Sequence, residues 1–202
     1  FPIGLRQYET AVKYVLDHAV ELKVDPKRII LMGDSSGGNF ASQIAHKYSQ
    51  QIALQVLYYP AIYLDESNKA FEWNLSEFDI DPNYKEFIEP RLSLGRMDEH
   101  ADKSFVYFIF KLYLQNNESC NIDELNSFYL DPKKFPRTLI FTSEYDGLRI
   151  QDELFAKKLA ANGIETKVIR YRGIHHAFIE KVGYFPQAED SFIEIANEIK
   201  LL

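Results

Sequence analysis

The sequence predicts an α/β fold of three layers, in which a mainly parallel β-sheet lies between helices. Short, fully apolar runs alternate with longer stretches whose apolar residues recur every three or four positions. The first pattern is typical of strands buried on both faces, and the second is typical of helices with one apolar side. With 202 residues, of which 46% are hydrophobic and 26% charged, the chain suits one globular domain with a sizeable core.

The first part of the chain predicts a helix followed by a strand–turn–helix unit. Residues Leu5 to Leu22 carry an apolar stripe at helical spacing, and Asp25-Pro26 ends this helix. The apolar run Ile29 to Met32 predicts a buried strand, which leads through a glycine-rich turn into a helix over Asn39 to Tyr48. A second buried strand is predicted from Leu54 to Tyr59.

The last part of the chain continues the alternation. A strand over Thr138 to Thr142 precedes a helix over Ile150 to Ala161, and Gly163 stands where a helix C-terminal glycine is expected. Thr166 to Arg170 predicts a fourth strand, and Gln187 to Ile199 predicts a final amphipathic helix. Strands that alternate with helices in this way favour parallel pairing.

The segment from Tyr63 to Asn126 interrupts this alternation. It is rich in aromatic and acidic residues, among them Trp73, and it contains the apolar stretch Phe105 to Leu114. It is too long for a plain loop in a compact domain. We therefore expect residues 63–126 to form an inserted helical, cap-like segment over one end of the sheet. An ordinary crossover helix with long connections is the alternative.

Composition excludes several classes of function. The chain carries 23 basic and 30 acidic residues, a net charge of −7, without a basic block, so nucleic acid is not an expected partner. Cys120 is the single cysteine, which excludes an internal disulfide and fits a reducing, cytoplasmic location. The sequence has no run of about 18 apolar residues that would span a membrane. No set of His, Cys and carboxylate residues has ligand spacing, so we expect neither a metal nor an organic cofactor.

The glycine-rich turn after the first strand is a candidate for a nucleophilic serine. Ser35 stands in the pattern Gly33-x-Ser35-x-Gly37, between a predicted strand and a predicted helix. A serine on so sharp a turn needs small neighbours, which Gly33, Gly37 and Gly38 supply. The helix behind the turn directs N–H groups and its positive dipole end toward the serine, which favours a developing oxyanion. A solvated glycine-rich turn is the alternative.

A serine nucleophile needs a base and a group that orients this base. His175 and His176 follow the last predicted strand, at the end of a parallel sheet where active sites are built. Asp146 follows the preceding strand at the same end of the sheet. The other histidines are less suitable, because His18 and His46 fall inside predicted helices and His100 falls inside the 63–126 segment.

Three segments resemble motifs of the hormone-sensitive-lipase-like branch of the α/β-hydrolases, a family of esterases and lipases. Residues 33–39, Gly-Asp-Ser-Ser-Gly-Gly-Asn, resemble its Gly-Asp-Ser-Ala-Gly-Gly-Asn elbow, with Ser36 in place of Ala. Residues 144–148 are similar to its Asp-Pro-Leu segment, with Gly147 for Pro. Residues 173–178 are similar to its Gly-Met-x-His-Gly-Phe segment, with Ala177 for Gly. The chain order serine, acid, histidine is also that of α/β-hydrolases.

The resemblance implies an α/β-hydrolase fold and a Ser-His-Asp triad. Ser35 would be the nucleophile, His176 the base and Asp146 the group that orients it, with the backbone N–H of Ser36 as one oxyanion donor. His175 is the rival base. The implied chemistry is hydrolysis of a short, uncharged acyl ester, a small-molecule substrate, through an acyl-enzyme and without a cofactor.

The sequence is also compatible with other functions. They are a non-catalytic binding protein that kept the triad, and a peptidase or an arylformamidase on the same fold. Asp34, inside the elbow, and the nearby Glu144 are expected to make hydrogen bonds in the turn and the loop. Asp152 and Glu153 open a helix, where the dipole favours acids, so no catalytic role is assigned to them.

Two features of the family are not found in this chain. It has no His-Gly-Gly-Gly segment, whose backbone N–H groups complete the oxyanion hole in that family, and it lacks the family's first strands. We therefore expect a fragment of a longer hydrolase, a truncated gene product, or a chain whose missing half another chain supplies. The strand Ile29 to Met32 would then have an unpaired edge, which predicts self-association or pairing with the missing N-terminal segment.

Overall fold

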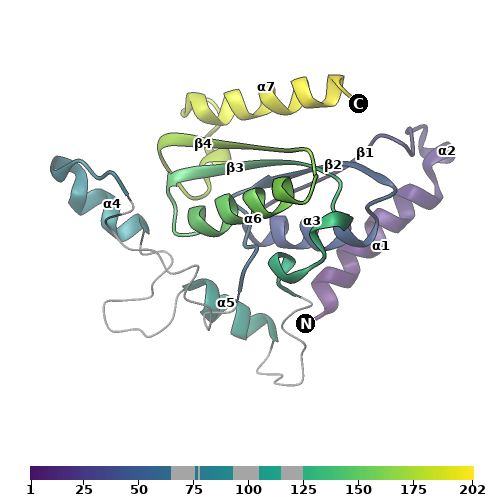
Figure 1. Ribbon diagram of the computed structural model, residues 1–202, viewed down its shortest axis with the longest axis horizontal. Coiled ribbons are helices and arrows are strands. Elements are labelled where there is room, and N and C mark those ends of the chain that lie inside the picture. Colours follow the sequence, from purple (N-terminus) through teal and green to yellow (C-terminus); the bar gives the residue numbers. More distant parts are fainter. Residues whose placement is uncertain (65–75, 77, 93–104, 115–124) are drawn as a thin grey trace.

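The computed structural model describes the chain except for residues 65–75, 77, 93–104 and 115–124 (Figure 1). Trp73, His100 and Cys120 therefore lie outside the described residues. The centre is a four-stranded sheet in the order β1-β2-β3-β4 with parallel pairing throughout. Its strands are β1 (Ile29–Asp34), β2 (Ile52–Tyr58), β3 (Arg137–Tyr145) and β4 (Thr166–His175). The prediction of a parallel α/β sheet is confirmed.

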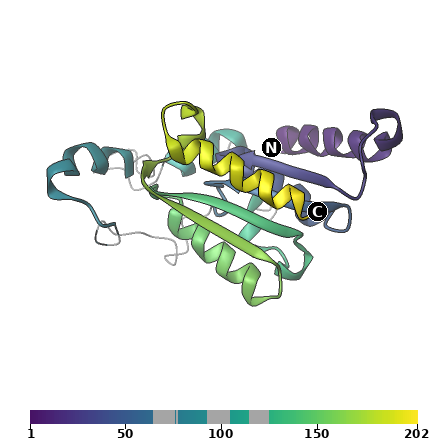
Figure 2. The ribbon, with the colours of Figure 1, turned by 90° about the horizontal axis from the view of Figure 1, so that it is seen from above.

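Helices cover both faces of this sheet. α3 (Ser35–Lys47) and α6 (Arg149–Ala161) lie on one face, and α7 (Pro186–Lys200) lies on the other (Figure 1). Seen from above, α7 runs along the strands, and α1 (Ile3–Asp17) lies beside β1, at the side of the sheet away from β4 (Figure 2).

The core has two parts because successive strand residues point to opposite faces. Leu57 of β2 and Ile140 of β3 belong to the cluster shared with α1, α3 and α6. Their neighbours Tyr58 and Phe141 belong to the cluster shared with α7. These four side chains are at most 2% exposed, which explains why the central strands are apolar without alternation.

One helix and the strands have boundaries that differ from those expected from the sequence. The predicted helix Leu5 to Leu22 is divided at His18 into α1 and the short α2 (Ala19–Leu22), with the His18 ring stacked on Tyr14 at 4.2 Å. The strands run further than their apolar runs, because parallel pairing also satisfies the backbone of polar and glycine residues such as Asp34, which pairs with Tyr58. Gly163 has φ +86°, as expected for a glycine that ends a helix.

The described part of residues 63–126 contains two α-helices. They are α4 (Lys85–Leu92), preceded by the 3₁₀ turn η3 (Pro82–Tyr84), and α5 (Phe105–Leu114), which coincides with the predicted apolar stretch. The two ends of the segment meet, because the Leu64 N–H donates to Asn126 Oδ1 at 2.7 Å. The interpretation of the segment as a cap-like insertion stays a prediction. Further 3₁₀ turns in the described part of the chain are η6 (Ser127–Tyr129), η7 (Pro132–Lys134) and η8 (Phe178–Lys181).

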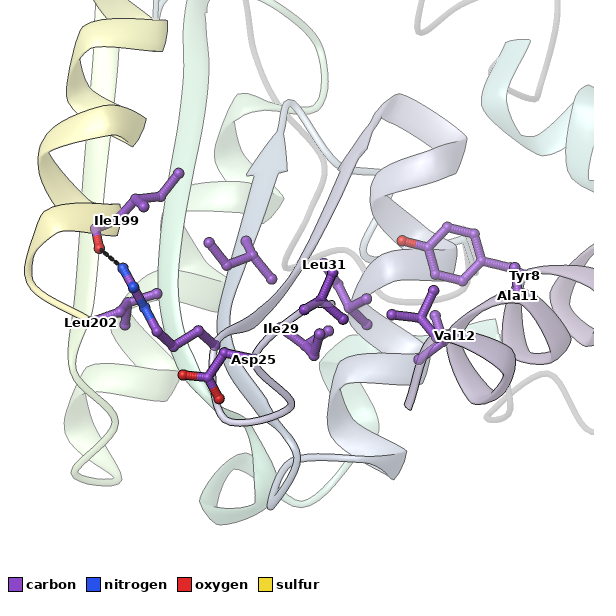
Figure 3. A pocket seen from close by; sticks show the side chains of 12 residues that line it. Tyr8, Ala11, Val12, Asp25, Ile29, Leu31, Ile199 and Leu202 are labelled. Carbon is purple, nitrogen blue, oxygen red and sulfur yellow. Dashed lines mark hydrogen bonds between the residues drawn. The ribbon is translucent and has the colours of Figure 1, made fainter. Parts of the chain in front are cut away.

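The outer edge of β1 faces an apolar groove. Within the part of the chain that the structure describes, β1 pairs with β2 alone. A groove of about 640 Å³ runs along its other side, between Val12 of α1, Leu31 of β1 and Leu202 after α7 (Figure 3). Tyr8 of α1 satisfies one edge group, since its hydroxyl donates to the Met32 carbonyl at 3.2 Å. The helix therefore covers part of an edge that we expected it to leave open.

Candidate active site

The turn between β1 and α3 holds Ser35 in a strained conformation. Ser35 has φ +50°, a region that residues other than glycine rarely adopt. The turn is tight at two glycines: a Cβ on Gly33 would lie 2.2 Å from the Gly37 carbonyl oxygen, and a Cβ on Gly38 would lie 2.8 Å from Cβ of Pro60. The absence of side chains at Gly33 and Gly38 is thus what lets the strand end and the helix start approach each other.

Gly37 does not share this role. A Cβ at this position would meet Asp34 Oδ1 at 3.6 Å, which is an ordinary contact. The prediction that Gly37 must be small to avoid a collision is therefore wrong, because the close approach involves its backbone and not the space beside its Cα. Asp34 also differs from expectation: it is exposed, and its side chain makes no capping hydrogen bond to α3.

The structure brings Ser35, His176 and Asp146 together from three strand ends. His176 Nε2 lies 3.0 Å from Ser35 Oγ, and His176 Nδ1 lies 2.7 Å from Asp146 Oδ2. The other carboxylate oxygen of Asp146 accepts the Leu148 N–H at 2.9 Å. The Asp146 side chain is 4% exposed and that of His176 is 23% exposed, so the carboxylate is enclosed while the imidazole remains reachable.

The other described histidines lie elsewhere. His175 is the last residue of β4, and its Nδ1 lies 2.7 Å from the His176 carbonyl oxygen. His46 lies in the last turn of α3 and packs on Phe135, with ring centroids 4.8 Å apart. Of the histidines that the structure describes, His176 is thus the one in contact with Ser35.

Opposing influences act on the pKa of His176. Burial lowers this pKa, but the hydrogen bond and the negative charge of Asp146 raise it, and the charges of Asp34 and Glu180 raise it further. The net effect is a pKa above the ordinary value for histidine. A carboxylate on Nδ1 favours the tautomer that leaves Nε2 free to take a proton from the serine.

Two further residues support the site and were not identified from the sequence. Tyr59, with φ +34°, is fully buried and its ring centroid lies 4.5 Å from that of His176. Asn39 is buried in α3 and donates from Nδ2 to the carbonyls of Ala61 and Leu125, at 2.7 and 2.8 Å. Asn39 belongs to the elbow motif, which was the one available signal, whereas nothing local distinguishes Tyr59 from a core tyrosine.

Asp152 is a buried carboxyl group behind the Asp146 loop. It is fully buried in the first turn of α6, and its Oδ2 accepts from Thr142 Oγ1 at 3.0 Å. Burial, followed by the negative charge of Asp146, raises the pKa of Asp152 well above its usual range. Its position in the helix was expected, but its burial could not be seen in the sequence.

A backbone N–H lies next to Ser35, and the described ranges contain no metal-type cluster. The Ser36 N–H lies in the first turn of α3, where helix N–H groups have no intrahelical acceptor. Outside residues 65–75, 77, 93–104 and 115–124, no three His, Cys, Asp or Glu side chains are grouped as metal ligands. None of the described helices is both long enough and apolar enough to cross a membrane.

Comparison with known proteins shows which family this chain matches. A family model described as an alpha/beta hydrolase fold matches residues 1–180. The chain is 26% identical over 187 residues to an arylesterase of Saccharolobus solfataricus, covering 89% of this chain and 53% of that protein. It is 23% identical over 195 residues to the carboxylesterase NlhH of Mycobacterium tuberculosis, covering 95% of this chain and 56% of that protein. The chain spans about half the length of the curated relatives it matches.

Solved structures agree with this assignment. A thermostable carboxylesterase cloned from a metagenomic library superposes with a TM-score of 0.76 at 26% identity, over 98% of this chain and 63% of that one. An esterase of Pyrobaculum calidifontis superposes with a TM-score of 0.75 at 25% identity, over 99% of this chain and 61% of that one. These matches confirm the resemblance to esterase-type hydrolases that the motifs indicated.

The two glycines at the elbow give a matched pair of variants. We expect Gly33→Ala to lower the free energy of unfolding by about 1–3 kcal/mol, the range for overpacking, because its Cβ would overlap the backbone of Gly37. Gly37→Ala should be neutral or slightly stabilising, since the space is open and alanine is the better helix residue. Chemical denaturation measures both. Equal losses would show that the turn is not held by the Gly33 contact.

The buried carboxyl group predicts a pH-dependent stability. A folded-state pKa above the unfolded value of about 3.9 means that the folded chain keeps a proton that the unfolded chain has released. Stability should therefore fall as pH rises from about 4 toward the folded-state pKa. Asp152→Asn has no carboxyl group to titrate and so avoids this loss. The unfolding free energy of the variant, relative to that of the parent, should therefore increase between pH 4 and pH 8. Urea unfolding across this range tests it, and a constant difference would contradict the raised pKa.

Proposed function

Because the chain belongs to the α/β-hydrolase fold family, we propose that it carries the active site of a serine carboxylic-ester hydrolase. The observation that carries this proposal is the continuous contact from Ser35 Oγ through His176 to Asp146, at 3.0 and 2.7 Å. In this proposal Ser35 is the nucleophile, His176 the general base and Asp146 the residue that orients the imidazole.

The reaction proceeds in two acyl transfers. His176 Nε2 takes the proton of Ser35 Oγ as this oxygen attacks the ester carbonyl carbon, and the Ser36 N–H donates to the developing oxyanion. The imidazolium then protonates the leaving alcohol, and an acyl-enzyme on Ser35 remains. A water molecule, deprotonated by His176, attacks the acyl carbon and releases the acid and the free serine.

The substrate that we propose is a short acyl ester without a negative charge. Asp34 and Glu180 place negative charge near His176, in addition to Asp146, and the chain as a whole carries −7. An anionic substrate would approach against this field. Proteins similar to this chain are named as an arylesterase and carboxylesterases, which supports an ester over a peptide or a formamide.

The identity of the nucleophile can be tested with a fluorophosphonate label. We expect Ser35→Ala to abolish labelling and Ser36→Ala to leave it largely intact, because the first residue bears the hydroxyl next to His176 while the second contributes its backbone N–H. Mass spectrometry of the labelled peptide locates the adduct. Labelling that survives in Ser35→Ala and disappears in Ser36→Ala would overturn the assignment. Rates with p-nitrophenyl esters, peptides and formamides then separate the esterase from a peptidase or an arylformamidase.

The base and its partner give a second test. His176→Ala should be far more damaging than His175→Ala, and Asp146→Asn should slow labelling by on the order of 10²–10⁴-fold without unfolding the chain. His176 must be neutral to act as base, so the rate should rise with pH through its pKa. Since Asp146 raises that pKa, Asp146→Asn should move this rise to lower pH. Equal losses at both histidines in variants that remain folded by circular dichroism would contradict the assignment of the base.

We also propose that the outer edge of β1 pairs with further strands. An edge of unpaired N–H and C=O groups beside an apolar groove favours pairing with another chain. The partner would be either a second copy of this chain or a segment that carries the N-terminal strands of the family. Such a segment would also bring the second oxyanion donor. Loss of one such donor costs about 10²–10³-fold in turnover.

Light scattering after size-exclusion chromatography tests the pairing. We expect species larger than 23.6 kDa at micromolar concentration, and turnover of p-nitrophenyl acetate far below the ~1–10³ s⁻¹ of natural enzymes until the partner segment is added. A monodisperse monomer with slowly exchanging amides in Ile29 to Met32 would show that the edge is protected in another way. If this monomer turned over p-nitrophenyl acetate at the rate of natural enzymes, the chain would not lack a second oxyanion donor.

A further inference from the structure

The pairing of β3 with β4 is interrupted just before the site. The strands pair one to one up to Ser143 and Tyr171, and the next pair is Tyr145 with His175. A single residue of β3, Glu144, therefore stands opposite the three residues 172–174 of β4. β4 thus carries a bulge of two extra residues, which ends at His175, the residue before His176. Bulges beside active sites increase the local twist and redirect the side chains that follow.

The carboxylate of Glu144 fills this bulge. Its Oε2 accepts the Gly173 N–H at 2.7 Å, and its Oε1 lies 3.6 Å from Arg172 Nε. The side chain is 12% exposed, and the backbone carbonyl of the same residue accepts from Arg149 Nη1 at 3.1 Å. Gly173 has φ +75°, so the chain turns at this point. Glu144 thereby binds an N–H group that the bulge removes from the strand ladder.

The contact joins the two loops that carry the base and its partner. Glu144 lies two residues before Asp146, and Gly173 lies three residues before His176. We propose that Glu144 is a positioning residue: its carboxylate fixes the bulge in β4 and thereby sets His176 Nε2 at hydrogen-bonding distance from Ser35 Oγ. The catalytic meaning of this role rests on the proposed function.

The role is geometric and not electrostatic. Asp146, Asp34 and Glu180 carry negative charges that raise the pKa of His176, whereas Glu144 directs its charge to Arg172 and its acceptor oxygen to Gly173. A glutamine keeps an acceptor oxygen on a side chain of the same length. Glu144→Gln should therefore preserve the position of His176, and Glu144→Ala should not.

The experiment compares these variants in the full chain by two measurements. The first is the rate of fluorophosphonate labelling at Ser35, with its pH dependence, and the second is the low-field NMR signal of the proton between His176 Nδ1 and Asp146. We expect Glu144→Ala to slow labelling at least tenfold and to shift or broaden the signal. Glu144→Gln should stay within about twofold of the parent, with the same pH midpoint.

Glu194→Ala is the matched control, because Glu194 pairs with Lys167 of β4 at 2.6 Å, five residues before the bulge. It should behave like the parent. A Glu144→Ala variant with parental labelling and an unchanged signal would overturn the proposal. So would a Glu144→Gln variant as impaired as Glu144→Ala, or one with a displaced pH midpoint, since the charge would then be the cause.

A second set of variants separates positioning from stability. Gly173, Gly163 and Gly183 have φ +75°, +86° and +85°, and a Cβ at each would meet no atom within 4 Å. Alanine should therefore strain all three to a similar extent. We expect similar losses in unfolding free energy, but slower labelling and a changed proton signal for Gly173→Ala alone. Parental labelling and signal in Gly173→Ala would overturn the proposal.

A parent chain that the label does not modify would contradict the proposed function, while the proton signal would still report the position of His176.

Discussion

The site depends on the parallel register of the four strands, because this pairing ends all of them at one edge of the sheet. The first residue after each strand enters the site: Ser35 after β1, Tyr59 after β2, Asp146 after β3 and His176 after β4. The terminal pairs Asp34 with Tyr58, Tyr58 with Phe141 and Tyr145 with His175 fix the relative heights of these ends. A shift by one residue in any pair would turn a site residue to the opposite face.

This convergence requires strained backbone at the edge. Ser35 and Tyr59 both have positive φ, and Ala177, directly after His176, has φ +64°. The surrounding contacts hold them in place: the Tyr59 N–H donates to the Phe141 carbonyl at 2.7 Å, and the Ala61 N–H donates to the Ser35 carbonyl at 3.0 Å. At Ser35 and Tyr59 the strained backbone is thus held by hydrogen bonds to the neighbouring strand or loop.

The sequence was sufficient for the features that local pattern determines. Apolar runs located the strands, and Ser35, Asp146 and His176 could be selected because strand ends and motif segments coincide there. It was not sufficient where a residue's role depends on a partner far along the chain. An acid in the first turn of a helix has the same pattern whether it is exposed or buried as Asp152 is, and the bulge opposite Glu144 exists only in the pairing of β3 with β4. The overlap at Gly33 likewise follows from the helix start folding back on the strand.

The hydrogen bond between Leu64 and Asn126 has a consequence for how this protein can change in evolution. It brings the two ends of a long segment together, so a change in the segment's length acts as a change in the length of a closed loop. Each doubling of the length of a closed loop costs only about 0.6 kcal/mol. Insertions and deletions between these anchors can accordingly accumulate with little effect on folding, while the strand ends stay the same.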